Sequence, residues 1–253
     1  MKPLLLCSLL LPALTAFSQK QQGSRFDAYY FSMHSFTTTT CLQDTLVEKL
    51  VKKTQEQLKS KASKDEIVFY RATPPLSDSF FKQLTPKEHF IYAHQYPESY
   101  MQNCSFSGFD AEEDKKIFAH LPFMIEGVRM SKRQATALEK NRDSSLVYLK
   151  QCITSAGNIP LAYKMTINNL DAYELIPLIV ATEKANPGKD TYLYSLVMEM
   201  MEKDKFDTFI KSDLYKELYG ERKSYRTSIA STAEKRQAII SMATAWFEQK
   251  QKR

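Results

Sequence analysis

Helical periodicity, interrupted by frequent capping and stop signals, is the feature that most constrains the fold of this chain. The clearest case is a helix that Asp190 is expected to cap, where apolar residues recur at the spacing of one helix face: Leu193, Leu196, Val197, Met200 and Met201. Capping boxes at residues 85–88 and 231–234 mark the starts of two more helices. The chain has only six glycines, whereas tight hairpins and phosphate-binding loops need glycine where the backbone turns sharply. We therefore predict an all-α or nearly all-α fold.

The remaining helical segments are short. Leucine and valine residues from 42 to 58 recur at helical spacing with lysines on the opposite face, and the chain from residue 143 onward is a series of short helices. Ile-Pro-Leu occurs at 159–161 and again at 176–178, but no fixed repeat period emerges. We predict an irregular multi-helix domain whose carboxyl half resembles a helical-repeat array.

The first eighteen residues have the order of parts of a signal peptide. Lys2 precedes an uncharged apolar run, and Ala16 and Ser18 occupy positions that signal peptidase accepts. The run is shorter than the roughly 20 residues of a membrane-spanning helix. Cys7 lies inside it, unlike the cysteine that ends a lipoprotein signal. We expect cleavage before Gln19 and a soluble, exported mature chain, in the periplasm or outside the cell.

Residues 19–41 form a different segment, with aromatic residues at 26–36 and four threonines at 37–40. We predict an extended aromatic arm over 19–41 and a helical domain over 42–253, with a sub-boundary near 141–143. The hydrophobic content of 43% suits a globular chain with a core. The net charge of +6 is mild beside 29 acidic residues, so we do not expect nucleic acid as a partner.

Three cysteines remain once Cys7 is removed with the signal. An oxidising compartment permits a disulfide between two of Cys41, Cys104 and Cys152. Cys152 falls in an apolar helical pattern, whereas the other two lie in polar, loop-like surroundings. We predict a Cys41–Cys104 disulfide and a free, buried Cys152.

Two arrangements are candidates for catalysis. Cys104 could serve as a nucleophile activated by His94, but the residues around it give no reason for a lowered thiol pKa. Glu98 and Asp110 could act as an acid pair of the kind that glycosidases use. The acidic segment at 112–114, however, is typical of a solvated helix face. We therefore predict no catalytic residues, and keep Cys104 with His94 as the weaker hypothesis.

The histidines do not form a metal-binding pattern. His89 and His94 are five residues apart, which places them about 140° from each other on a helix. The sequence contains neither His-Glu-x-x-His nor Cys-x-x-Cys. His34 and the nearby acids Glu88 and Glu98 would have to complete a site. We predict no metal site and no cofactor.

A basic segment near the carboxyl end is a candidate surface for an anionic glycan, nucleic acid or lipid headgroup. Its residues are Arg222, Lys223, Arg226, Lys235 and Arg236. Nearby glutamates dilute the charge, so a solvated face is the simpler interpretation. The methionines at 198, 200, 201 and 242 could line a groove for a partner, although methionine on a helical stripe more often fills a core.

Three segments carry a resemblance to other proteins: Ala-Phe-Ser-Gln at 16–19, Tyr-Met-Gln-Asn-Cys at 100–104, and the stretch at 190–220. The chain resembles exported proteins of unassigned function from Bacteroidetes-type bacteria, over its middle and carboxyl half. The resemblance implies a host and a compartment but no reaction. We predict a non-catalytic exported interaction or scaffold protein of the bacterial cell envelope, with an envelope protein or a glycan as partner. The alternative is an exported hydrolase that uses Cys104 with His94 or an acid pair.

Overall fold

The computed structural model describes residue 38 and residues 40–61, 74–101, 112–122, 127–220 and 227–252. Eleven α-helices make up most of this part of the chain, which confirms the all-α prediction. None of the helices in these ranges is long and apolar enough to cross a membrane. The predicted signal peptide and nearly all of the predicted aromatic arm lie outside the described residues.

The helices are α2 (Thr45–Lys61), α3 (Asp78–Gln83), α4 (Pro86–Gln95), α5 (Lys132–Lys140), α6 (Arg142–Ala156), α7 (Leu161–Asn169), α8 (Ile176–Ala185), α9 (Tyr192–Lys203), α10 (Asp207–Ile210), α11 (Asp213–Tyr219) and α12 (Ala233–Gln251). The strands are β1 (Ser99–Met101), β2 (Lys116–Phe118), β3 (Gly127–Arg129) and β4 (Ser228–Ala230). Two 3-10 helices are η2 (Glu113–Lys115) and η3 (Tyr173–Leu175).

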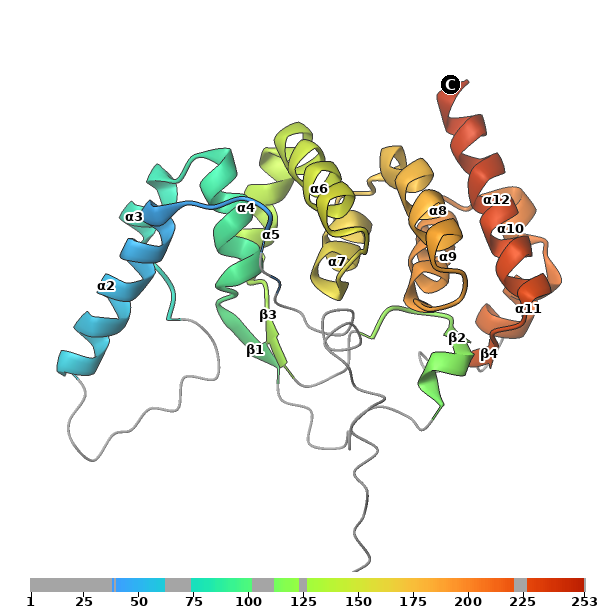
Figure 1. Cartoon of the computed structure of the whole chain (residues 1–253), viewed down its shortest axis with the longest axis horizontal. Coiled ribbons are helices and arrows are strands. Elements are labelled where there is room, and N and C mark those ends of the chain that lie inside the picture. The colour runs from blue at the N-terminus through green and yellow to red at the C-terminus, as the bar shows by residue number, and fades with distance from the viewer. Residues whose placement is uncertain are drawn as a thin grey trace, which may run out of the picture.

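The helices follow one another across the molecule in chain order, from α2 at one end to α12 at the other (Figure 1). α4 packs on α5 and α6, α7 packs on α9, and α12 packs on both α8 and α9. The predicted sub-boundary near 141–143 falls where α5 meets α6, and these two helices contact each other. Packing between helices that are close in sequence therefore builds most of the fold.

One part of the chain departs from this order and links the region of α4 and α5 with the end of the molecule that holds α11 and α12. β1 pairs antiparallel with β3, but β2, which lies between them in sequence, pairs with β4 beside α11 (Figure 1). The Ser195 hydroxyl on α9 donates to the Phe118 carbonyl over 2.7 Å. The rings of Phe118 and Tyr192 stack with centroids 5.9 Å apart. This part of the chain is thus fixed to α9 as well as to β4.

α9 is the centre of the core. The predicted apolar face is buried, and so are residues outside that face, such as Tyr194, Ser195 and Met198. A helix that is buried nearly all round lies inside a domain rather than on its surface. Met200 and Met201 are buried and Met242 packs against the same core. These methionines therefore fill the core, and Met200 also borders a pocket between α9 and α12.

The predicted helix starts are correct in one case and displaced in another. Thr85 forms its capping box with Glu88, whose carboxylate accepts from the Thr85 N–H over 2.6 Å. The capping box predicted at 231–234 does not form: α12 begins one residue later than predicted, and Ser231 N–H donates to the Lys115 carbonyl and continues the β2–β4 pairing. Thr232 caps α12 instead, accepting from the N–H of Lys235.

Candidate binding pocket

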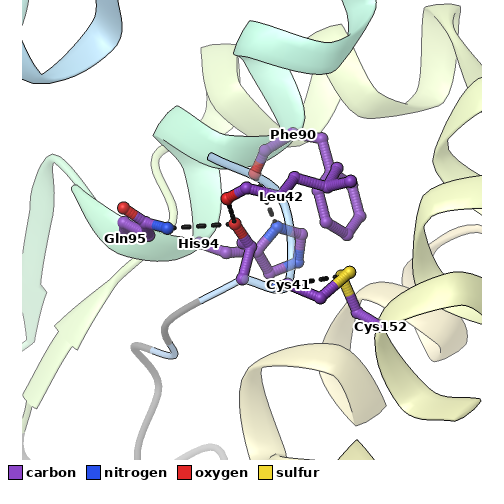
Figure 2. The surroundings of a disulfide bond; sticks show 7 residues. Cys41, Leu42, Phe90, His94, Gln95 and Cys152 are labelled. Atoms are coloured by element: carbon purple, nitrogen blue, oxygen red, sulfur yellow. Dashed lines mark hydrogen bonds between the residues drawn. A yellow bond between two sulfur atoms is a disulfide. The ribbon is translucent and has the colours of Figure 1, made fainter. Parts of the chain in front are cut away.

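The disulfide joins Cys41 to Cys152, so the predicted Cys41–Cys104 pair was wrong (Figure 2). The Cα atoms are 5.0 Å apart and the two residues are separated by 111 positions. The apolar pattern around Cys152 correctly indicated burial, but a buried thiol on α6 can still face a partner on a neighbouring segment. Cys104 lies outside the described residues.

Hydrogen bonds hold the segment beside Cys41 on α4. Thr38 N–H donates to the His94 carbonyl over 3.0 Å. The Gln95 amide donates to the Thr40 hydroxyl over 2.9 Å, and that hydroxyl donates to the Leu42 carbonyl over 2.7 Å (Figure 2). The end of the predicted arm is therefore bound to α4 by hydrogen bonds and to α6 by the disulfide.

His94 is a core residue and not an accessible catalytic base. Its Nδ1 lies 2.8 Å from the Phe90 carbonyl and its Nε2 lies 2.9 Å from the Thr166 hydroxyl. Because the carbonyl can only accept, Nδ1 carries a proton, and the Thr166 hydroxyl has both Nε2 and the Ala162 carbonyl, 3.0 Å away, within hydrogen-bond distance. Burial lowers the pKa of His94 to about 4. The ring is fully buried, so it has no nitrogen free to serve a thiol at neutral pH.

Glu98 belongs to a structural cluster. Its carboxylate accepts from the Tyr92 hydroxyl over 2.7 Å, from the Ser131 hydroxyl over 2.7 Å, and from the guanidinium of Arg133 through Nε over 2.8 Å and through Nη2. Burial raises the pKa of Glu98, but these hydrogen bonds outweigh it and lower the pKa below the ordinary value. A carboxylate with this many donors is fixed in its ionised form. Asp110, its proposed acid partner, lies outside the described residues.

The histidine and carboxylate candidates for a metal site serve other contacts. The ring of His89 packs edge-on against Phe81 with centroids 4.6 Å apart. Glu88 caps α4 through Thr85. In the described ranges, no three histidine, cysteine, aspartate or glutamate side chains are grouped as a metal ion would require. His34 lies outside these ranges.

The two described members of the predicted basic surface also have partners within the chain. Lys235 Nζ lies 3.0 Å from the carboxylate of Glu217. Arg236 donates to the Ser231 carbonyl over 2.7 Å, and its guanidinium packs beside Gly188. The remaining members at 222, 223 and 226 lie outside the described residues.

A pocket that the sequence did not indicate lies between the start of α6, η3, the end of α9 and α12. Its volume is about 480 Å³, within the range of small-molecule sites. Its lining comes from several separate stretches of chain: Glu139, Arg142, Asn169, Leu170, Asp171, Tyr173, Met200, Lys203, Asp204, Trp246 and Lys250. No local motif could predict a site whose residues are spread over more than a hundred positions.

Asp204 orients one wall of the pocket. Its carboxylate accepts from the Trp246 indole N–H over 2.8 Å and from Lys250 Nζ over 2.6 Å. Lys250 Nζ also lies 5.6 Å from the centroid of the Tyr173 ring and 6.0 Å from that of Trp246. These distances allow cation–π attraction. The lysine is thus held between a carboxylate and two aromatic rings.

Arg142 and Lys203 hold the other wall. Arg142 donates to the Leu170 carbonyl over 3.0 Å and to the Asp171 carbonyl over 3.2 Å, and it pairs with Glu174. Lys203 Nζ lies 2.5 Å from the Asp171 carboxylate. Asp171 has a left-handed backbone with φ of 48°, a strained conformation that persists where neighbours hold it in place. Both cations hold it here.

The charges that line the pocket balance. Arg142, Lys203 and Lys250 face Glu139, Asp171 and Asp204 in the same lining. Among the described lining residues there is no cysteine, histidine, serine or threonine. These groups can bind a ligand, and each of the three cations is paired with a carboxylate of the same chain.

Comparison with known proteins does not extend this picture. The chain matches no protein-family model, no curated protein and no solved structure.

Proposed function

We propose that this chain is an exported, non-catalytic interaction protein of the bacterial cell envelope that binds a small polar ligand in the pocket between α6, η3, α9 and α12. The observation that carries the proposal is a pocket whose charged side chains are already held in place by partners within the chain. Arg142 is fixed by Glu174, Lys250 by Asp204, and Lys203 by Asp171. Ligand binding then costs little side-chain entropy, because these side chains are already ordered.

The balance of charges favours a neutral or zwitterionic ligand. An anion would meet Glu139, Asp171 and Asp204, and a cation would meet the arginine and the two lysines. The half-buried ring of Tyr173 offers an apolar face to such a ligand. Short peptides and amino-sugar glycans, both components of bacterial envelopes, combine these properties.

The disulfide supports export. Disulfides persist in secreted and periplasmic proteins and are rare in the reducing cytosol. The Cys41–Cys152 bond closes a loop over more than a hundred residues. This agrees with the signal peptide predicted at residues 1–18.

The chain's single tryptophan is part of the pocket, so its fluorescence reports on binding there. We would titrate the purified protein with free amino acids, dipeptides and oligomers of N-acetylglucosamine. We expect a saturable change in Trp246 emission for at least one of these classes. The Lys203→Ala variant should weaken it, whereas Lys211→Ala, which removes an exposed lysine on the surface beside α10, should not.

Two results would contradict the proposal. In one, no compound of the panel changes the emission, and nuclear magnetic resonance fragment screening places no fragment in the pocket. In the other, a ligand binds equally well to the Lys203→Ala and Lys211→Ala variants and to the unaltered protein.

A further inference from the structure

Lys164 on α7 and Asp190 at the start of α9 form a buried pair that does not line the proposed pocket. Lys164 Nζ lies 2.7 Å from Asp190 Oδ2, and the side chains are 0% and 5% exposed. The two residues are distant in sequence, so the contact joins two packed helices of the core. The pair combines a nucleophilic amine and a carboxyl group with almost no access for water.

The polar atoms of this pair are poorly satisfied for an ion pair. Neither Lys164 Nζ nor either carboxyl oxygen of Asp190 has a hydrogen-bond partner in the part of the chain that the structure describes. The two groups are thus in contact without the angles of a hydrogen bond. Asp190 was predicted to cap α9, but the cap residue is Thr191, which makes no side-chain cap bond. A buried ion pair is stable only when such additional hydrogen bonds are made.

We infer that Lys164 and Asp190 condense after folding to form an intramolecular isopeptide bond between α7 and α9. The lone pair of Nζ attacks Cγ of the carboxylic acid, a C–N bond forms, and the C–OH bond breaks. One amine proton joins the departing hydroxyl, so a single water molecule leaves. Nothing is oxidised or reduced, and no co-reactant is required.

The surroundings favour the reactive forms of both groups. Burial lowers the pKa of Lys164 and raises the pKa of Asp190, and this favours a neutral amine beside a neutral acid. Two reactants held in contact in a rigid site react as fast as they would in solution at a very high concentration of one of them.

The product also removes an energetic cost. A single amide replaces an amine and a carboxyl group that are buried without hydrogen-bond partners. The bond would fix α7 to α9 at the centre of the core, as the disulfide fixes the segment at residue 41 to α6. The molecule would then carry two covalent links of different chemistry.

Intact mass spectrometry of the reduced, denatured mature protein tests the inference without any variant. We expect a mass lower than that of the sequence by one water molecule. Tryptic digestion should yield a branched peptide that contains both Lys164 and Asp190, with no cleavage after Lys164. An unchanged mass after prolonged incubation of the folded protein would overturn the inference, and so would a water loss that maps to other residues.

Three variants sharpen the test. Lys164→Met and Asp190→Ala should each abolish the mass loss. Asp190→Asn should lose ammonia in place of water and give a product of the same mass as the cross-linked protein. If Lys164→Met does not fold, the Asp190→Asn result still decides the matter, because a folded Asp190→Asn variant that stays uncrosslinked contradicts the proposed attack on Cγ.

Discussion

Two acid–base pairs join distant elements of this protein, and they differ in what surrounds them. Arg133 and Glu98 are satisfied at nearly every polar atom, since Arg133 also donates to the Leu76 carbonyl over 2.6 Å and Glu98 accepts from two hydroxyls. Lys164 and Asp190 contact each other, and their polar atoms have no hydrogen-bond partner within the described residues. The planar guanidinium can satisfy several acceptors at once, whereas an ammonium acts as a compact point charge.

Burial alone therefore does not say what a charged pair does. The side chain of Glu98 is 4% exposed and that of Asp190 is 5% exposed, yet their pKa values move in opposite directions. Hydrogen bonds to Glu98 lower its pKa despite burial, whereas burial raises the pKa of Asp190 despite Lys164. The first pair is a stable clamp between α3, β1 and α5. The second is held in place by the packing of α7 on α9.

The largest effect is expected from Lys164→Met. It leaves Asp190 buried without a partner and removes the link between α7 and α9, so we expect a loss of about 3–5 kcal/mol in the free energy of unfolding. Urea denaturation followed by circular dichroism measures this loss. The double variant Lys164→Met with Asp190→Leu should recover the part of the loss that comes from the unpartnered carboxyl group, but not the part that comes from the missing link. A double variant as unstable as the single one would contradict this account.

His94 adds a buried group whose charged form is disfavoured by burial. The unfolded histidine takes up a proton as the pH falls below about 6.5, whereas the folded one does so only at about 4. Stability should therefore decrease as the pH falls from 6.5 to 4, by up to about 3 kcal/mol. Thermal unfolding across this range measures the slope. The His94→Gln variant should show a flatter profile, and an equal slope in both proteins would count against the assignment.

Arg133→Met should have a smaller effect than Lys164→Met. It removes several charged hydrogen bonds from Glu98, but the arginine side chain is 28% exposed, so water can enter the gap. We expect a loss of about 2–3 kcal/mol. Arg133→Lys should also destabilise the protein, because lysine cannot reproduce the fork that contacts Glu98 and Leu76 together. Urea denaturation measures both variants, and a neutral Arg133→Lys would show that charge alone matters.

The comparison also explains what the sequence could predict. Helices and the Thr85 capping box follow from local spacing, and both are present. The sequence equally suggested that Asp190 caps α9, but a lysine from another helix contacts its carboxyl group instead. The disulfide prediction failed for the same reason, since which segment lies over Cys152 is decided by tertiary packing. The pocket was missed because its lining comes from residues 139 to 250.

The smallest effect on the free energy of unfolding is expected for an ion pair on the protein surface. Lys211 and Asp207 are four residues apart beside α10, 2.8 Å between charged atoms, and both are largely exposed. Water screens such a pair and the side chains lose entropy when they meet, so we expect Lys211→Met to change the free energy of unfolding by no more than about 0.5 kcal/mol. Urea denaturation in low and high salt measures it. If Lys211→Met destabilises the protein as much as Arg133→Met does, the number of hydrogen bonds made by each charged pair does not determine how much the pair contributes to stability. The difference between the Arg133–Glu98 and Lys164–Asp190 pairs would then need another cause.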